Sequence, residues 1–110
     1  MSVENKNVID IVSIDEEGNA VLTISDHLEW DIENEHILIL QDKINCYLQA
    51  IEGGDLYNKY PNAKDRKIVI RIIALHSPND DGQIFLERVR NILETTGYGF
   101  QFSQHQIISD

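Results

Sequence analysis

Apolar residues recur along this chain first with the period of a β-strand and then with the period of a helix. Residues 8–14 read VIDIVSI and residues 20–25 read AVLTIS, and both runs are rich in the β-branched residues that favour strands. The polar residues between them, DEEGN, include Gly18 and Asn19, either of which tolerates the positive φ of a tight turn. The pattern predicts an antiparallel hairpin.

A helical period follows the hairpin. Apolar residues separated by three or four positions indicate a helix with one buried face. In this segment the residues with that spacing are Ile37, Leu40, Ile44, Tyr47, Leu48 and Ile51. Asp31 or Asn34 can cap the first turn. Gly53 and Gly54 are typical of the residues that end a helix.

The second half of the chain repeats the two periods. Residues 67–76, KIVIRIIALH, are apolar on both faces, which is typical of a strand at the centre of a sheet. After the loop SPNDDG, residues 82–96 predict a second helix whose buried stripe contains Phe85, Val89, Ile92 and Leu93. Residues 98–106 place aromatic residues at alternate positions, as in a half-buried or edge strand.

The predicted order is therefore ββαβαβ. It corresponds to an α+β fold, a two-layer sandwich in which a four-stranded mixed sheet carries two helices on one face. We expect one domain over residues 1–110, with its core between about residues 8 and 106. Because the third strand is apolar on both faces, we expect the open face of the sheet to be covered by a second subunit in a homodimer.

Charge narrows the classes of partner. The net charge is −10, and residues 8–42 contain ten acidic residues and no Lys or Arg. A field of this sign repels phosphate backbones, so we expect no nucleic-acid binding and instead a protein partner with a basic surface. No apolar run reaches the length of a membrane span, the N-terminus lacks a signal-peptide pattern, and there is a single cysteine, Cys46. These features predict a cytoplasmic protein without membrane attachment.

An acidic and histidine-containing cluster lies between the second strand and the first helix. The cluster consists of Asp26, His27, Glu29, Asp31, Glu35 and His36. These side chains can supply oxygen and nitrogen ligands to a metal. None of the usual metal-binding spacings is present, and acids near a helix start also complement the helix dipole. We therefore predict no metal and no cofactor. His36, in the first helical turn, could instead point towards water.

Acid–base chemistry is a second candidate. His76 ends the third strand, and Asp26 or His27 ends the second. If those strands are parallel, a His–carboxylate pair at their ends could act as a general base. The sequence carries no nucleophile elbow and no phosphate-binding loop to accompany such a pair.

Three aromatic residues are candidate contact residues. Trp30 lies between Glu29 and Asp31, where it can staple the helix start against Ile37 or Leu38, or anchor a partner. Tyr57 and Tyr60 lie among the basic residues of the connection 55–67. Either they form a contact site, or Tyr57 and the neighbouring Leu56 fold back on the end of the first helix.

The segments DHLEW, EH, LQDKIN, YLQAIEGGDL, YP and KIVIRI resemble a family of small uncharacterised bacterial domains. The resemblance extends from about residue 8 to residue 102. The D-H-L-x-W and Y-P positions are Asp26, His27, Leu28, Trp30, Tyr60 and Pro61. The resemblance implies a stand-alone bacterial domain of similar fold and assigns no activity.

These observations favour a non-enzymatic protein-interaction module. One specific version is an immunity-type protein that masks a basic toxin through its acidic face. The alternative is a small-molecule or metal-binding enzyme that uses the region of Asp26, His27, His36 and His76.

Overall fold

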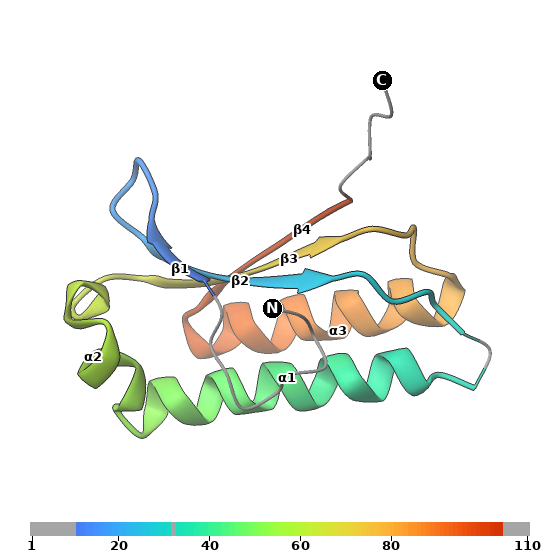
Figure 1. Cartoon of the computed structure of the whole chain (residues 1–110), viewed down its shortest axis with the longest axis horizontal. Helices are drawn as coiled ribbons and strands as arrows, with labels where there is room; N and C mark the ends of the chain where they lie inside the picture. The colour runs from blue at the N-terminus through green and yellow to red at the C-terminus, as the bar shows by residue number, and fades with distance from the viewer. Residues whose placement is uncertain (1–10, 32, 105–110) are drawn as a thin grey trace.

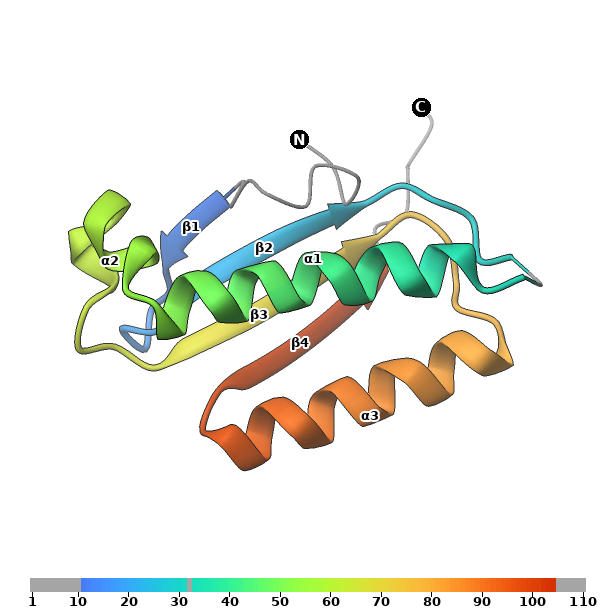
Figure 2. The same cartoon turned by 90° about the horizontal axis from the view of Figure 1, so that it is seen from below.

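The computed structural model describes residues 11–31 and 33–104, and within them the predicted α+β order ββαβαβ is confirmed. A sheet forms one layer and the two long helices form the other (Figures 1 and 2). The principal elements are β1 Ile11–Ile14, β2 Ala20–Asp26, α1 Glu35–Glu52, β3 Ile68–Ala74, α3 Asp80–Thr96 and β4 Gly99–Gln104.

The sheet has the order β1-β2-β3-β4 and is mixed. β1 pairs antiparallel with β2, whereas β2 with β3 and β3 with β4 are parallel. In register, Asp26 lies opposite Ala74, which lies opposite Gln104. The C-terminal ends of three strands therefore lie in one row, and the starts of α1 and α3 lie at the same end of the molecule (Figure 1).

The predicted hairpin is present, although residues 8–10 of its first strand lie outside the described residues. One carboxylate organises its turn, because Asp15 Oδ1 accepts hydrogen bonds from the backbone N–H groups of Glu17 (3.0 Å) and Asn19 (2.8 Å). The Asn19 N–H is the main reason that the pKa of Asp15 lies below its ordinary value. Of the two residues suited to positive φ, Gly18 adopts it, at +85°.

The core lies between the sheet and the helices. Alternate residues of β2 and β3 point towards α1 and α3, so Leu22, Ile24, Ile70 and Ile72 are fully buried. From α1, Leu40 and Tyr47 close on them and are also fully buried. The strand period of two and the helix period of 3.6 thus meet in one apolar layer.

Two valines on the open face of the sheet are buried within the single chain. Val21 and Val69 point away from the helices by register, yet each is at most 4% exposed within the single chain. Arg71, on the same face, donates a hydrogen bond from Nε to Gln101 Oε1 at 2.9 Å. Little apolar surface is left at these positions for a second subunit to cover.

The connection between α1 and β3 contains two short helical segments that the sequence analysis did not predict. They are α2, Asp55–Lys59, and the 3-10 helix η1, Pro61–Ala63. Leu56 and Ala63 are buried, and Tyr57 and Tyr60 pack partly buried against the core. For Tyr57 and Leu56 the structure therefore favours packing against the core, whereas Tyr60 lines a pocket with Val12 and Ile14 of β1.

The buried stripe of α3 differs from the predicted one. Leu86, Val89 and Leu93 are buried, whereas Ile92 is 60% exposed and was wrongly assigned to the core. The inward-facing residues follow the spacing of Gly82, so Ile92 lies on the flank of the helix. Within the described ranges, no helix combines the length and apolarity that crossing a membrane requires.

Candidate functional site

The candidate site lies where β2 and β3 end and where α1 and α3 begin. The loop from β2 to α1 and the loop from β3 to α3 run beside each other, and Leu75 donates its backbone N–H to the Asp26 carbonyl at 2.9 Å. This arrangement follows from the parallel pairing of β2 with β3. Exposed acids rim this end of the molecule: Glu29, Glu33, Glu35, Asp80 and Asp81.

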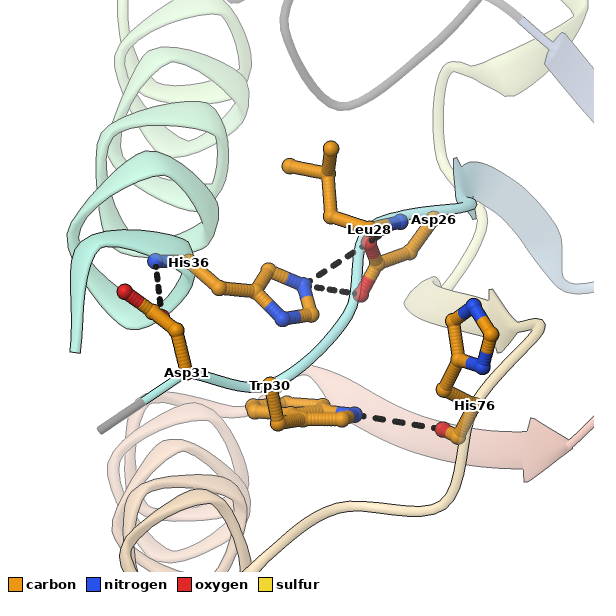
Figure 3. A network of polar contacts seen from close by, with 6 residues as sticks. All are labelled: Asp26, Leu28, Trp30, Asp31, His36 and His76. Carbon is orange, nitrogen blue, oxygen red and sulfur yellow. Dashed lines mark hydrogen bonds and ion pairs between the residues drawn. The ribbon is translucent and has the colours of Figure 1, made fainter. Parts of the chain in front are cut away.

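A buried histidine–carboxylate pair is the centre of the site. His36 Nε2 lies 2.8 Å from Asp26 Oδ1 and 2.7 Å from Asp26 Oδ2 (Figure 3). The two residues are only 3% and 2% exposed. Asp26 Oδ1 also accepts a hydrogen bond from the Leu28 backbone N–H at 3.2 Å. The pair therefore joins the last residue of β2 to the first turn of α1.

Of the two orientations that the sequence left open for His36, the structure shows that the side chain does not point towards water. Its position four residues before Leu40 places it on the inward stripe of α1. The Nε2–H tautomer satisfies Asp26, and it leaves Nδ1 buried without a hydrogen-bond partner among the described residues. Such an orphaned buried polar atom is uncommon in folded proteins.

Trp30 covers this pair from the loop. Its indole N–H donates to the His76 carbonyl at 3.1 Å, and its ring centroid lies 4.1 Å from that of His36 (Figure 3). The other side of the indole lies against α3, where a Cβ added to Gly82 would be 2.6 Å from Trp30 Cε3. Trp30 is thus a partly buried bridge between the two helix starts, packed against the core.

Asp31 supplies the hydrogen bonds that cap α1. Its carboxylate accepts from the backbone N–H of His36 at 3.0 Å and from that of Glu35 at 3.1 Å. The first of these bonds is the main reason that the pKa of Asp31 lies below its ordinary value. Asn34 occupies the cap position itself in the left-handed conformation, and its side chain donates to Asp81 Oδ2 at 3.2 Å.

The structure brings together only part of the predicted site. The structure connects four of them in one network: Asp26, Trp30, Asp31 and His36. His76 joins this network through its backbone carbonyl. His27 and Glu29 are exposed on the same loop. Tyr57 and Tyr60 belong to the α2 region at the opposite end of the molecule (Figure 1).

Two contributors were not singled out by the sequence analysis, although both belong to the loop SPNDDG that was expected to cap the second helix. Gly82 makes room for Trp30, and Asn79 caps α3 by accepting the Gly82 backbone N–H at 2.8 Å. The Asn79 cap has a sequence signal, since Asn three residues before an N–H donor at a helix start is a standard cap. No sequence signal connects Gly82 with Trp30, because that contact exists only in the folded chain.

The geometry limits the chemistry that this site can perform. The His36 ring is buried and lies against Trp30, and its Nε2 is already engaged by Asp26. Across residues 11–31 and 33–104, no three His, Cys, Asp or Glu side chains are grouped closely enough to hold a metal ion. The pair therefore acts as an internal tie between strand and helix in this structure.

Comparison with known proteins identifies the family. The profile of a family of unknown function, DUF6572, matches residues 1–106. The chain belongs to this family, which confirms the resemblance to an uncharacterised domain. Searches of curated proteins and of solved structures found no significant match.

We predict that His36→Ala lowers the free energy of unfolding by about 3–5 kcal/mol, because it leaves the Asp26 carboxylate buried without its partner. Urea unfolding followed by circular dichroism measures the change. His76→Ala is the control, since it keeps the backbone carbonyl that Trp30 uses and should cost about 1 kcal/mol or less. If both variants lost the same free energy of unfolding, the stabilising role assigned to the Asp26–His36 pair would be contradicted.

Gly82→Ala should also destabilise the protein, by about 1–3 kcal/mol, because the new methyl group collides with the indole of Trp30. Alanine has the higher helix propensity, by up to about 1 kcal/mol, so the clash has to outweigh that gain. In a Trp30→Ala background the same substitution should be neutral or stabilising. If it is equally destabilising there, the contact with Trp30 is not its cause.

The lowered pKa of Asp31 predicts a pH dependence. The folded state favours the carboxylate, so this stabilisation is present at neutral pH and is lost as the pH falls below about 4. The difference in unfolding free energy between wild type and Asp31→Asn should therefore shrink with acidification. Glu33→Gln, which removes a nearby exposed charge, should show no comparable trend. A difference that stays constant from neutral to acidic pH would refute the role of Asp31.

Proposed function

We propose that this member of DUF6572 is a non-enzymatic protein-binding module and that its binding surface is the groove between α1 and α3. The observation that carries the proposal is a set of exposed isoleucines beside an apolar hollow on this face. Ile92 is 60% exposed and Ile84 is 54% exposed. Exposed apolar side chains grouped in this way are typical of contact surfaces.

The groove has the shape to receive a helix. Its main hollow has a volume of about 240 Å³, and both helices line it, with Leu48 from α1 and Phe85 and Ile92 from α3. A second hollow continues it towards the helix starts and includes Ile84, and the two share three lining residues, Gln41, Phe85 and Arg88. An amphipathic helix can lay its apolar face in a continuous groove of this kind.

Charge supports a basic partner. Exposed acids lie on both helices that form the groove: Glu35, Asp42, Asp81 and Glu87. Arg88 is the basic side chain among the residues that line the two hollows. With a net charge of −10 on the whole chain, a helix with an apolar stripe and flanking lysines or arginines has the complementary chemistry.

An immunity-type protein that masks a basic toxin is the specific version of this function that we favour. The acidic rim around the starts of α1 and α3 continues the acidic surface of the groove. Opposite charges would steer the two proteins together, so association would be fast and would slow as salt is added. Charge complementarity is the support for this version.

The enzyme alternative has less support. It requires the region of Asp26, His27, His36 and His76 to contact a substrate. The His36 ring is 3% exposed and lies against Trp30. His76 contributes its backbone carbonyl to the network (Figure 3).

A designed peptide tests the groove. The probe is a fluorescein-labelled amphipathic helix of leucine and lysine, about 18 residues or five turns long, titrated with the protein in an anisotropy assay. Replacing Ile84 and Ile92 together by serine should weaken binding by about tenfold or more. The reason is that each buried isoleucine contributes roughly 1.5–3 kcal/mol and 1.4 kcal/mol is tenfold.

Leu38→Ser is the matched control, because Leu38 is as exposed as Ile92, at 60%, and does not line either hollow. It should leave the affinity unchanged, and a leucine–glutamate peptide should not bind. The proposal fails if the isoleucine variant binds as well as wild type, or if Leu38→Ser weakens binding equally.

A further inference from the structure

We infer that the outer edge of β4 is a self-association site, at which a second copy of this chain adds its own β4 antiparallel and extends the sheet. β4 is the last strand in the order β1-β2-β3-β4 and pairs with β3 on one side. Within the described part of the chain, no strand pairs with its other side. A strand edge of this kind presents a row of unpaired backbone N–H and C=O groups.

β4 lacks the features that normally protect a sheet edge. Its sequence, GFQFSQ, contains no charged residue and no proline, and these are the usual means of preventing edge pairing. The opposite edge differs, because β1 has only four described residues and the α2–η1 segment lies beside it. Val12 and Ile14 share a pocket there with Lys59, Tyr60 and Pro61. Among the described residues, β4 is the longer of the two edge strands.

A hollow beside β4 is placed to receive side chains of an added strand. It has a volume of about 240 Å³ and lies between α3 and β4, with Leu86, Glu87, Arg90, Phe100 and Phe102 in its lining. Phe102 is only partly buried. Figure 2 shows α3 running alongside β4 at this side of the sheet. A free strand edge next to a groove against a helix is the geometry of β-strand addition.

The chemistry of β4 fits a second copy. An added strand must direct apolar side chains towards the helix layer and polar ones towards the open face. β4 itself has this pattern, with Phe100 packed in the core and with Gln101 and Ser103 exposed. A two-fold axis perpendicular to the sheet would therefore pair β4 of one copy with β4 of the other, with apolar side chains of both on one face and polar side chains of both on the opposite face.

Electrostatics also favour this edge over the rest of the surface. Two chains of net charge −10 repel each other, and the repulsion is smallest where the contact contains few acids. β4 is uncharged, two cations lie beside it, and the acid Glu87 lines the same hollow as one of them, Arg90. Arg71 donates a hydrogen bond to Gln101, and the Arg90 guanidinium lies 5.4 Å from the centroid of the Phe100 ring. The edge strand is thus uncharged, with charges of both signs beside it, on an acidic protein.

The test is the oligomeric state of the full chain, measured by sedimentation velocity over a concentration series. We expect a monomer–dimer equilibrium for wild type. The double variant Gln101→Lys, Ser103→Lys should raise the dimer dissociation constant by roughly tenfold or more, because like charges would face each other across the new strand pair. Gln49→Lys, Thr95→Lys is the matched control, with the same added charge on exposed helical positions, and should dimerise at least as well as wild type.

Hydrogen exchange on the wild-type protein gives a second measurement that does not depend on how the variants fold. Amides of β4 should become more protected as the concentration rises, whereas those of β1 should not. The inference is overturned if the protein is monomeric up to millimolar concentration, or if the lysines in β4 and the lysines on the helices weaken a dimer equally. It is also overturned if a dimer forms without protecting β4. The α1–α3 groove is a different surface, so these outcomes do not decide the proposed function.

Discussion

The contact between Asp26 and His36 is the constraint on which this end of the molecule depends. It is a buried pair of polar side chains, and burying such groups is unfavourable unless each finds a partner. Asp26 is the last residue of β2 and His36 lies in the first turn of α1, so their contact sets where the helix begins over the sheet. A pair of this kind often stabilises no more than apolar residues of the same volume would, but it tolerates few alternative arrangements.

The neighbouring residues complete that arrangement. Asp31 satisfies the free N–H groups at the start of α1, and Trp30 closes the space between the pair and α3. The acidic cluster of the loop therefore has two roles that depend on position. Asp26 and Asp31 hold the structure together through hydrogen bonds, whereas Glu29, Glu33 and Glu35 face solvent and contribute to the surface field.

Periodic features of the fold could be predicted from the sequence, whereas contacts between distant segments could not. The strands and long helices repeat a hydrophobic pattern over many residues, so errors at single positions did not change their assignment. His36 and Lys43 were not assigned to the buried face of α1 because that face was traced through apolar residues alone, although both side chains lie on it and are buried. Ile92 was wrongly assigned to the buried stripe of α3 because it lies three residues after Val89 and Leu93 lies four residues after Val89. Both spacings are compatible with one face of a helix. The pairing of Asp26 with His36, and not with His76, depends on the path of the loop in space.

The parallel pairing of β2 with β3 has a consequence for how the chain reaches its native state. The hairpin and the Asp26–His36 contact, which spans 10 residues, close short loops. The Trp30–His76 bond, which spans 46 residues, belongs to a crossover that contains all of α1 and α2. The chain loses conformational entropy when such a long loop closes, before the contacts within it form. Topology of this kind therefore slows folding. We expect the docking of β3 against β2 to limit the folding rate, with the hairpin and the start of α1 already formed as its template.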